Sequence, residues 1–401
     1  MSFIPKLRFI VTSDIQYKVE VDVEKERFER GMQLAYQYAA SSPYPKIDAF
    51  FAVGDFANRG SEGEMLKLKQ SLDAVIHPET KITLMIASHE CFCEDGEAGA
   101  LARLKHFFNQ EPDNYFEIAG CPFICLSTDR HCRINDDRKR WLKSCLEKAA
   151  AGGKRRPFFV FQHPHLTDTV YGSINWGNDD IIPILTDYPQ VIDFSGHSHA
   201  PINDPRSIHQ KYFTSLGTGT ISYLELDEFD FMYGTIPPDC HECSQFYIVE
   251  VDEYNAVRIL PFDILTEQFF HEGYTLNTCW EPESFEFTEA RALTEAKPYF
   301  TSDFSCSYSL SLEHMLQITF PQAKTEGYRV NSYTVVLRNS DGDILAQKKI
   351  SSSYYRNTMP ETLSVEIPFN YASGEYTLEL YASGFWLTRS DKYVQTIFIQ
   401  N

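Results

Sequence analysis

Residues 50–60 read Phe50-Phe51-Ala52-Val53-Gly54-Asp55-Phe56-Ala57-Asn58-Arg59-Gly60, an apolar run that ends abruptly in a polar loop. The run from Ile47 to Val53 is typical of a strand buried on both faces. Gly54 suits a sharp turn, so Asp55 is expected at the carboxyl end of the strand, where α/β sheets bind their ligands. This stretch predicts a layered α/β domain with a functional site at one sheet edge.

The same arrangement of a strand and a polar cluster recurs four times. Four more apolar runs each lead into a polar cluster. They are Leu7–Val11 before Ser13-Asp14-Ile15-Gln16, Ile82–Ala87 before Ser88-His89-Glu90, Pro157–Phe161 before Gln162-His163-Pro164-His165, and Val191–Phe194 before Gly196-His197-Ser198-His199. Because strand carboxyl ends meet at one edge, we expect the five clusters to converge. Asp and His together are ligands for first-row transition metals, whereas a calcium or magnesium cage uses oxygen atoms alone. The clusters therefore predict a metal site.

The rest of the chain divides into two unlike parts. Helical periodicity over Glu24–Ala40, after the capping box Ser61-Glu62-Gly63-Glu64, and over Asp136–Ala150 separates the strands of a domain that we assign to residues 1–265. The polar, acidic stretch between Glu281 and Glu289 suggests a linker or a solvated edge, and residues 266–297 are assigned to this linker or edge segment. From residue 298 to 401 apolar residues recur with a period of two, which predicts a small β-sandwich of the immunoglobulin or fibronectin kind.

The amino-acid composition argues against several classes of binding partner. The 401 residues carry 36 Lys+Arg against 56 Asp+Glu, a net charge of −20 that repels nucleic-acid backbones and anionic membranes. No apolar run approaches the roughly 18 residues of a membrane span, and the N-terminus shows no secretion signal. Ten scattered cysteines fit a reduced, cytoplasmic protein that uses thiols as small apolar groups.

The five clusters resemble the motifs of the calcineurin-like metallophosphoesterases, whose pattern runs D-x-H, GDxxxR, GNH(E), H and GHxH. The resemblance covers residues from about 5 to 265 and looks most like bacterial members that carry an added C-terminal β domain. It implies a four-layer α/β/β/α sandwich with a dinuclear metal centre, followed here by the all-β domain. Two metals can activate a bridging hydroxide for in-line attack on phosphorus.

The resemblance also implies a role for each site residue. One metal would be held by Asp14, Gln16, Asp55 and His199. Asp55 would bridge to a second metal, held also by Ser88, His163 and His197. His89 would protonate the leaving group, Arg59 would hold phosphate oxygens, and Asn58 would orient His89. Substrate contacts are expected from Arg59, His165 and Tyr171.

Two positions depart from the family pattern. Gln16 replaces a His, and its amide oxygen shifts the expected metals toward Mn or Fe, with Zn as the alternative. Ser88 replaces an Asn with a shorter side chain, so the second metal is expected to bind less tightly. The predicted function is metal-dependent hydrolysis of a small phosphomonoester or phosphodiester. The alternatives are a non-catalytic protein that binds metal or phosphate on the same fold, and a nuclease, which the negative charge disfavours. Protein partners are left open.

Overall fold

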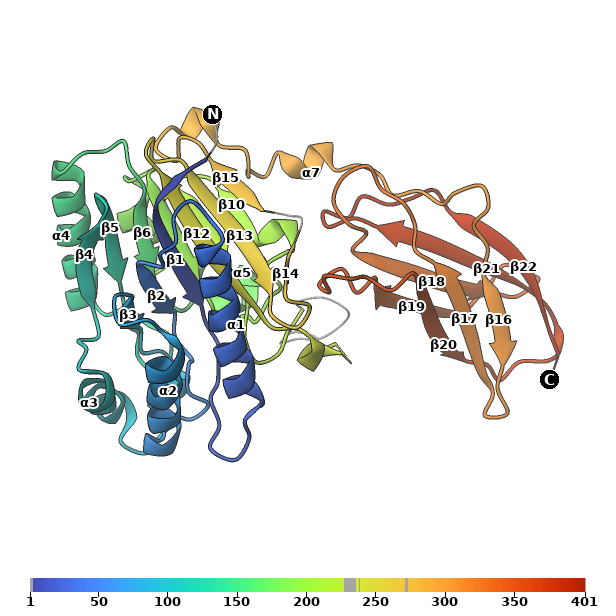
Figure 1. Ribbon diagram of the computed structural model, residues 1–401. Helices are drawn as coiled ribbons and strands as arrows, with labels where there is room; N and C mark the ends of the chain where they lie inside the picture. Colours follow the sequence, from blue (N-terminus) through green and yellow to red (C-terminus); the bar gives the residue numbers. More distant parts are fainter. Residues whose placement is uncertain (1–2, 227–235, 238, 271–272, 401) are drawn as a thin grey trace. The chain divides into compact units, whose positions relative to one another are not determined.

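The computed structural model describes residues 3–226, 236–237, 239–270 and 273–400 (Figure 1). The chain divides into two compact units, residues 1–288 and residues 289–401. Within the described residues no helix has both the length and the apolar composition needed to cross a bilayer. All ten cysteines are free thiols.

Two sheets lie face to face in the first unit. One sheet has the order β14-β13-β12-β1-β2-β3, with β15 paired to β13, and the other has the order β10-β11-β9-β6-β5-β4. The first sheet contains β1 (Pro5–Thr12), β2 (Ala49–Ala52), β3 (Lys81–Leu84), β12 (Gln245–Asp252), β13 (Val257–Asp263), β14 (Gln268–Phe269) and β15 (Tyr274–Leu276). The second contains β4 (Asn114–Ile118), β5 (Cys121–Cys125), β6 (Phe158–Phe161), β9 (Val191–Ser195), β10 (Ile208–Gln210) and β11 (Thr214–Gly217). Strands β1, β2 and β3 run parallel, as do β5, β6, β9 and β11, so their carboxyl ends meet at common edges.

Helices cover the outer face of each sheet. The first sheet packs against α1 (Val23–Ala40), α2 (Glu62–Val75) and α3 (Gly96–Phe108), and the second against α4 (Asp136–Ala151) and α6 (Ile182–Leu185). The face of α1 that carries Phe28 and Met32 is fully buried, as its periodicity predicts. Helix α2 begins at the predicted capping box, in which Ser61 and Glu64 cap each other. The α/β/β/α order of layers matches the sequence prediction.

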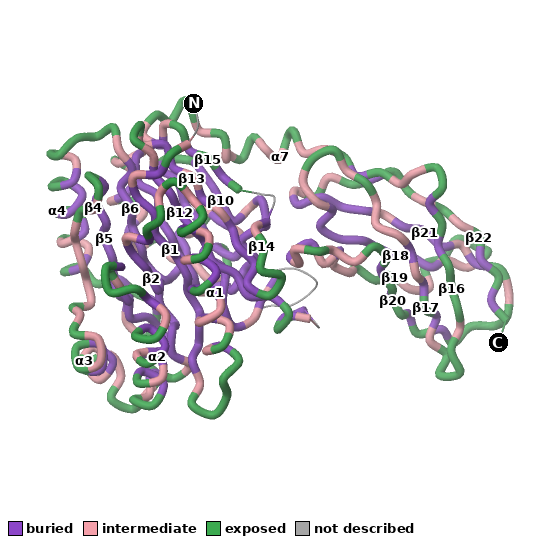
Figure 2. The backbone as a smooth tube through the Cα atoms, viewed as in Figure 1, coloured by how far each residue is buried: buried purple, intermediate pink, exposed green. Residues whose placement is uncertain are grey.

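The core between the two sheets is built from phenylalanine. The central strands β2, β5, β6 and β9 are buried along their whole length (Figure 2). The Phe9 ring meets the edges of Phe51 and Phe123 at centroid distances of 5.6 and 5.3 Å, and Phe51 stacks on Phe161 at 4.1 Å. Such aromatic pairs stabilise a core beyond the area they bury. The loops after β1, β2, β6 and β9 are therefore attached to a rigid base.

The second unit is the predicted β-sandwich. After a short helix, α7 (Arg291–Thr294), it forms one sheet of β16 (Ser307–Leu310), β17 (Met315–Pro321) and β20 (Thr362–Pro368). The other sheet has the order β19-β18-β21-β22, formed by β18 (Ser332–Arg338), β19 (Ile344–Ser351), β21 (Gly374–Ser383) and β22 (Tyr393–Ile399). Leu316, Val335 and Leu378 are fully buried between the sheets.

Part of the stretch 266–297, predicted to be a linker or a solvated edge, belongs to an edge of the first sheet. Strands β14 and β15 lie inside that stretch and pair with β13, so the first unit extends to residue 288. Tyr274 and Leu276 alternate inward and are about 95% buried against Val257 and Ile259. The acidic residues that suggested a linker begin only at Glu281, after this edge of the sheet.

Candidate metal centre

The five predicted clusters meet at the carboxyl ends of the strands. Backbone hydrogen bonds continue the strand pairing into the loops, from Asp14 N to Gly54 O (3.1 Å), from Gln16 N to Asp55 O (3.0 Å) and from Gly196 N to His163 O (2.9 Å). Gly54 has a φ of +84°, and a Cβ at this position would lie 2.5 Å from His163 Nδ1. The glycine that suggested a sharp turn thus allows two ligand loops to approach each other.

Five of the predicted ligands share an uncommon backbone conformation. Their φ angles lie between +49° and +75°, at Asp14, Gln16, Asp55, His197 and His199. This left-handed region is unfavourable for residues that carry a Cβ, and it persists where the surrounding structure enforces it, often at functional sites. The loops are therefore shaped to direct these side chains toward one point.

Asp14 and His199 form one half of the cluster. Asp14 Oδ1 lies 3.2 Å from His199 Nε2, and Asp14 Oδ2 accepts hydrogen bonds from Ser13 Oγ and His197 N. Burial by itself would raise the pKa of Asp14, but His199 and His163 together hold that pKa below its usual value. Asp14 is therefore an ionised, fully buried carboxylate.

Gln16 reaches this half of the cluster with its amide nitrogen foremost. Its Nε2 lies 3.2 Å from His199 Nε2, and its Oε1 accepts a hydrogen bond from Ser222 Oγ at 3.4 Å. The predicted ligation through oxygen requires the amide to turn over, an orientation that is set by hydrogen bonding. His199 itself is well oriented, because its Nδ1 donates to Tyr223 O at 2.9 Å and leaves Nε2 facing Asp14.

Asp55, His163 and Ser88 form the other half. His163 Nδ1 donates to Val53 O (2.7 Å), which directs Nε2 to within 2.9 Å of Asp55 Oδ2. Ser88 Oγ donates to both carboxylate oxygens of Asp55, at 3.2 and 3.0 Å. Burial opposes the charge on Asp55, yet the neighbouring histidines, His163 first, lower its pKa well below the usual value. Ser88 therefore orients the central carboxylate.

Two buried atoms in the cluster make no well-aligned hydrogen bond: Asp14 Oδ1, 3.2 Å from His199 Nε2, and His163 Nε2, 2.9 Å from Asp55 Oδ2. Leaving such groups unpaired is costly, so an orphaned carboxylate oxygen beside an orphaned imidazole nitrogen fits a cation between them. The ligand atoms of Asp14, Asp55 and His163 lie within 4.8 Å of one another, and those of Cys132, His163 and His197 do so as well. These residues fit divalent metal ions of the transition series.

His89 stands at the mouth of the cluster. Its side chain is 25% exposed, and its Nε2 lies 3.8 Å from Asp55 Oδ2. Nδ1 donates to the main-chain carbonyl of Asn58 at 2.7 Å. The sequence prediction that Asn58 orients His89 is thus met by the backbone of Asn58 and not by its side chain. Arg59 is exposed beside them.

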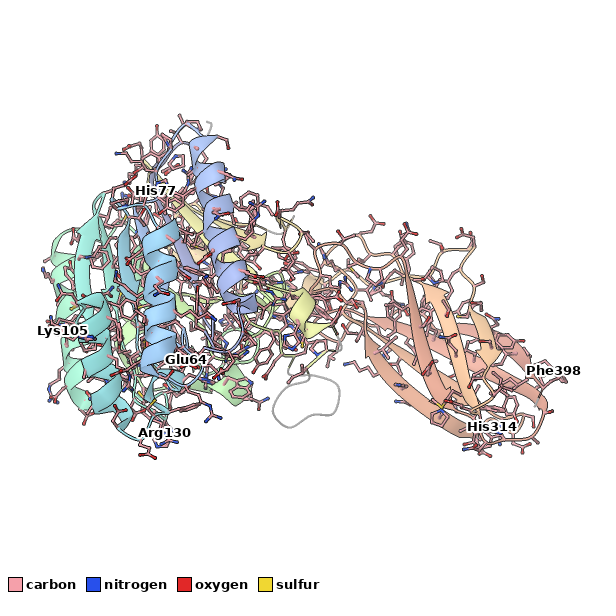
Figure 3. The ribbon with its side chains drawn as sticks, turned by 60° about the horizontal axis from the view of Figure 1, so that its bottom comes forward. Glu64, His77, Lys105, Arg130, His314 and Phe398 are labelled. Atoms are coloured by element: carbon pink, nitrogen blue, oxygen red, sulfur yellow. The ribbon has the colours of Figure 1, made fainter. Side chains whose placement is uncertain are left out.

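A second basic side chain, Arg130, is linked to His89 through the ring of Phe92. The Arg130 guanidinium is 5.6 Å from the Phe92 ring, which lies 4.5 Å from the His89 ring. Figure 3 places Arg130 at the same end of the domain as Glu64, with His77 at the opposite end. The sequence did not point to Arg130, because its contact with Phe92 is made between two loops that are distant in sequence.

The two predicted substrate contacts beyond Arg59 are placed differently. His165 is 1% exposed, and its Nδ1 and Nε2 lie 2.8 and 2.7 Å from Ser195 Oγ and Ser198 Oγ. Burial, then the nearby His197, lower its pKa to about 3, so His165 is a neutral buried group. In this structure His165 therefore offers almost no exposed surface for the predicted substrate contact. Tyr171 is partly exposed and lies under the Arg206 guanidinium at 3.9 Å.

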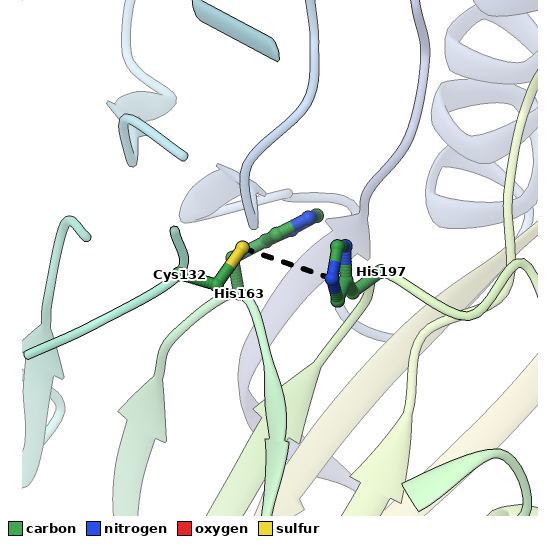
Figure 4. Close-up of side chains that lie close together, drawn as sticks. All are labelled: Cys132, His163 and His197. Carbon is green, nitrogen blue, oxygen red and sulfur yellow. Dashed lines mark hydrogen bonds between the residues drawn. The ribbon is translucent and has the colours of Figure 1, made fainter. Parts of the chain in front are cut away.

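Two further residues shape the centre. Glu90 is fully buried, and its carboxylate accepts the N–H groups of Asp55, Ala57 and Ala87 at 3.1, 2.9 and 2.9 Å, which ties two ligand loops together. Its sequence position beside His89 indicated the site but not this role. Cys132 Sγ lies 3.8 Å from His197 Nε2 (Figure 4), and nothing in its sequence context signalled it.

Comparison with known proteins gives one sequence match. Residues 7–201 match the family described as calcineurin-like phosphoesterase. A search of curated proteins gives no match. Among solved structures, the purple acid phosphatase PPD1 from yellow lupin (Lupinus luteus) seeds shares 14% identity and a TM-score of 0.48, over 67% of this chain and 53% of its own. This chain thus spans about half the length of that protein. Domains d3–d4 of the rat CD45 extracellular region match 32% of this chain and 56% of their own, with 11% identity and a TM-score of 0.21.

Proposed function

We propose that the chain is a metal-dependent phosphoester hydrolase in which two metal ions act together on a small phosphomonoester or phosphodiester. The match of residues 7–201 to the calcineurin-like phosphoesterase family supports this proposal. The observation that carries the proposal is the pair of buried carboxylates, Asp14 and Asp55, set among three histidines with orphaned ligand atoms. Such a set supports two neighbouring cations that share Asp55.

The proposed ligands divide between two positions. Asp14, Asp55, His199 and the turned amide of Gln16 would hold one cation. Asp55, His163 and His197 would hold the other, with Ser88 fixing Asp55 by hydrogen bonds. The first position is rich in oxygen donors, which supports Mn or Fe there.

Bound cations of this kind activate water and neutralise charge on the phosphoryl group. The chain supplies the rest. Two carboxylates facing two divalent cations leave the site positive, so it can attract a phosphate despite a net charge of −20. Arg59 is exposed at the mouth and is suited to hold phosphate oxygens with its planar guanidinium.

His89 is placed to move a proton at the leaving group. Its Nδ1–H donates to the Asn58 carbonyl, which fixes the ring, and the opposite nitrogen, Nε2, lies 3.8 Å from Asp55 Oδ2 on a side chain that is 25% exposed. A protonated Nε2 can donate to the leaving oxygen as the ester bond breaks. The surface charge supports a small substrate over a polyanion.

The proposal is tested by metal content and activity together. We expect the purified protein to hold up to two metal equivalents by elemental analysis and to hydrolyse an aryl phosphate or its bis-aryl diester. Asp55→Asn should lose metal and activity together, by more than the roughly 10–100-fold typical of residues that only support a ligand. Asp73→Asn, an exposed carboxylate paired with Lys69 on α2, is the matched control. An Asp55→Asn protein that keeps two metals and the parent rate would refute the proposal.

A further inference from the structure

Cys132 lies within the second half of the metal centre. Its Sγ is 3.8 Å from His197 Nε2, and the ligand atoms of Cys132, His163 and His197 all lie within 4.8 Å of one another (Figure 4). His163 Nε2 is one of the two orphaned atoms of the cluster. Two imidazoles and a thiol at this spacing form a set of soft and borderline donors of the kind that binds zinc, cobalt and iron.

The loop that carries Cys132 is held in place from several sides. Thr128 N donates to Ile86 O, Cys132 N to Asp129 O and Asn178 Nδ2 to Cys132 O, at 2.9, 3.0 and 2.9 Å. Cys132 has a φ of +57°, the same left-handed conformation as Asp55 at +49°. The thiol is therefore delivered to the histidines by fixed backbone geometry and not by a freely rotating loop.

The surroundings of Cys132 differ from those of the structural thiols. Cys125 and Cys145 belong to apolar cores, where a buried thiol acts as a small apolar group. Cys132 is 6% exposed and lies among the imidazoles of His163 and His197, beside the Ser88 hydroxyl.

We propose that Cys132 is a thiolate ligand of the metal held by His163 and His197. The inference deepens the proposed function, on which it rests. At position 88 the family pattern has Asn, whose amide oxygen can bind a metal. Ser88 has no amide, and its hydroxyl donates to Asp55. On ligation the Cys132 S–H bond breaks, its proton leaves to solvent, and the sulfur donates an electron pair to the cation with no change of oxidation state.

This ligand changes the metal preference of the two positions. A thiolate favours zinc, cobalt or iron over manganese, while the position of Asp14, Gln16 and His199 keeps more oxygen donors. The second metal, expected from Ser88 alone to be weakly held, is then retained through Cys132. The two positions consequently select different cations.

Cobalt provides a test that does not depend on activity. With two equivalents of Co²⁺ bound, the full-length protein should show a near-ultraviolet band from thiolate-to-cobalt charge transfer. Cys132→Ser should abolish that band and lose one equivalent to a weak chelator about 10–100-fold more readily. Cys93→Ser is the matched control, because the Cys93 thiol lies in a neighbouring loop and donates to the main-chain carbonyl of Arg59. The Cys93→Ser protein should keep the band.

Zinc in the unaltered protein gives a second measurement that needs no variant. X-ray absorption should find sulfur among the zinc neighbours at about 2.3 Å. Two bound equivalents with no sulfur neighbour and no near-ultraviolet band overturn the inference while leaving the proposed function intact. A band that survives in Cys132→Ser also overturns it. A protein that binds no cobalt and no zinc overturns the proposed function as well.

Discussion

Gly54→Ala probes the close approach on which the centre depends. Gly54 has a φ of +84°, and a new Cβ would lie 2.5 Å from His163 Nδ1 and 2.6 Å from the Cβ of Ala87. Real Cβ contacts are not this short, so the His163 ring or the Ala87 loop has to move. The displaced ring would lose its hydrogen bond to Val53 O, the bond that aims Nε2 at Asp55.

The expected cost has two parts. The left-handed backbone costs roughly 1–2 kcal/mol for alanine, and overlap in a tightly packed interior costs about 1–3 kcal/mol more. Gly54→Ala should therefore lower the free energy of unfolding by roughly 2–5 kcal/mol. Gly120→Ala is a matched control, because Gly120 has a φ of +78° but nothing within 4 Å of the new Cβ. It should cost only the first part.

The assay separates folding from metal binding. Urea unfolding of chelator-treated protein gives the two stability losses, and elemental analysis gives the metal content before chelation. Gly54→Ala should lose the metal at His163, whereas Gly120→Ala should keep two equivalents. If the two variants lost the same stability and both kept their metals, the close approach of the Gly54 and His163 loops would not be a constraint on the site.

The other predictions concern single side chains. His89→Ala should keep its metals but hydrolyse esters with poor leaving groups about 10²–10⁴-fold more slowly. Asn58→Ala should stay within about tenfold of the parent rate, because the main-chain carbonyl of Asn58, which the substitution keeps, is the group that holds His89. His77→Ala, at the far end of the domain, is the control, and steady-state kinetics give all three rates. Burial raises the pKa of Asp193 well above its usual value, so the folded protein holds this proton more tightly and its stability falls as the pH rises above about 4. Asp193→Asn should remove that fall and be about 1–3 kcal/mol more stable than the parent at pH 8 but not at pH 4, measured by urea unfolding.

The sequence predicts well those features that follow from strand pattern. Asp55 and His197 follow buried strands and a glycine, and parallel strands place such residues at one edge whatever the details of packing. The capping box at Ser61 is likewise local chemistry, so its prediction is confirmed. The strands β14 and β15 were not predicted within the linker or edge segment, because they are only two and three residues long, too short for a period of two to be recognised.

Orientation is where prediction from sequence stops. His165 is two residues from His163, yet the short strand β7 (His165–Leu166) turns its ring to Ser195 and Ser198. Gln16 is at the predicted place, but Ser222 and His199 decide which amide atom faces the centre. In both cases the deciding partner is distant in sequence and contributes no motif.

Cys132 and Ser88 show why such residues have to be considered together. The family's motif pattern treats each position separately. Judged in this way, Ser88 is a lost metal ligand, and Cys132, in the loop after β5, has no indicated role. In the folded chain Ser88 donates to Asp55 and Cys132 lies beside His163 and His197, where the hydrogen bonds of Thr128 and Asn178 fix the cysteine. Ser88, which holds the carboxylate, and Cys132, as the proposed ligand of the cation, can together replace the one asparagine of the family pattern. The departure from the pattern then reads as a substitution of ligand chemistry, which predicts a change of preferred metal and no loss of the site.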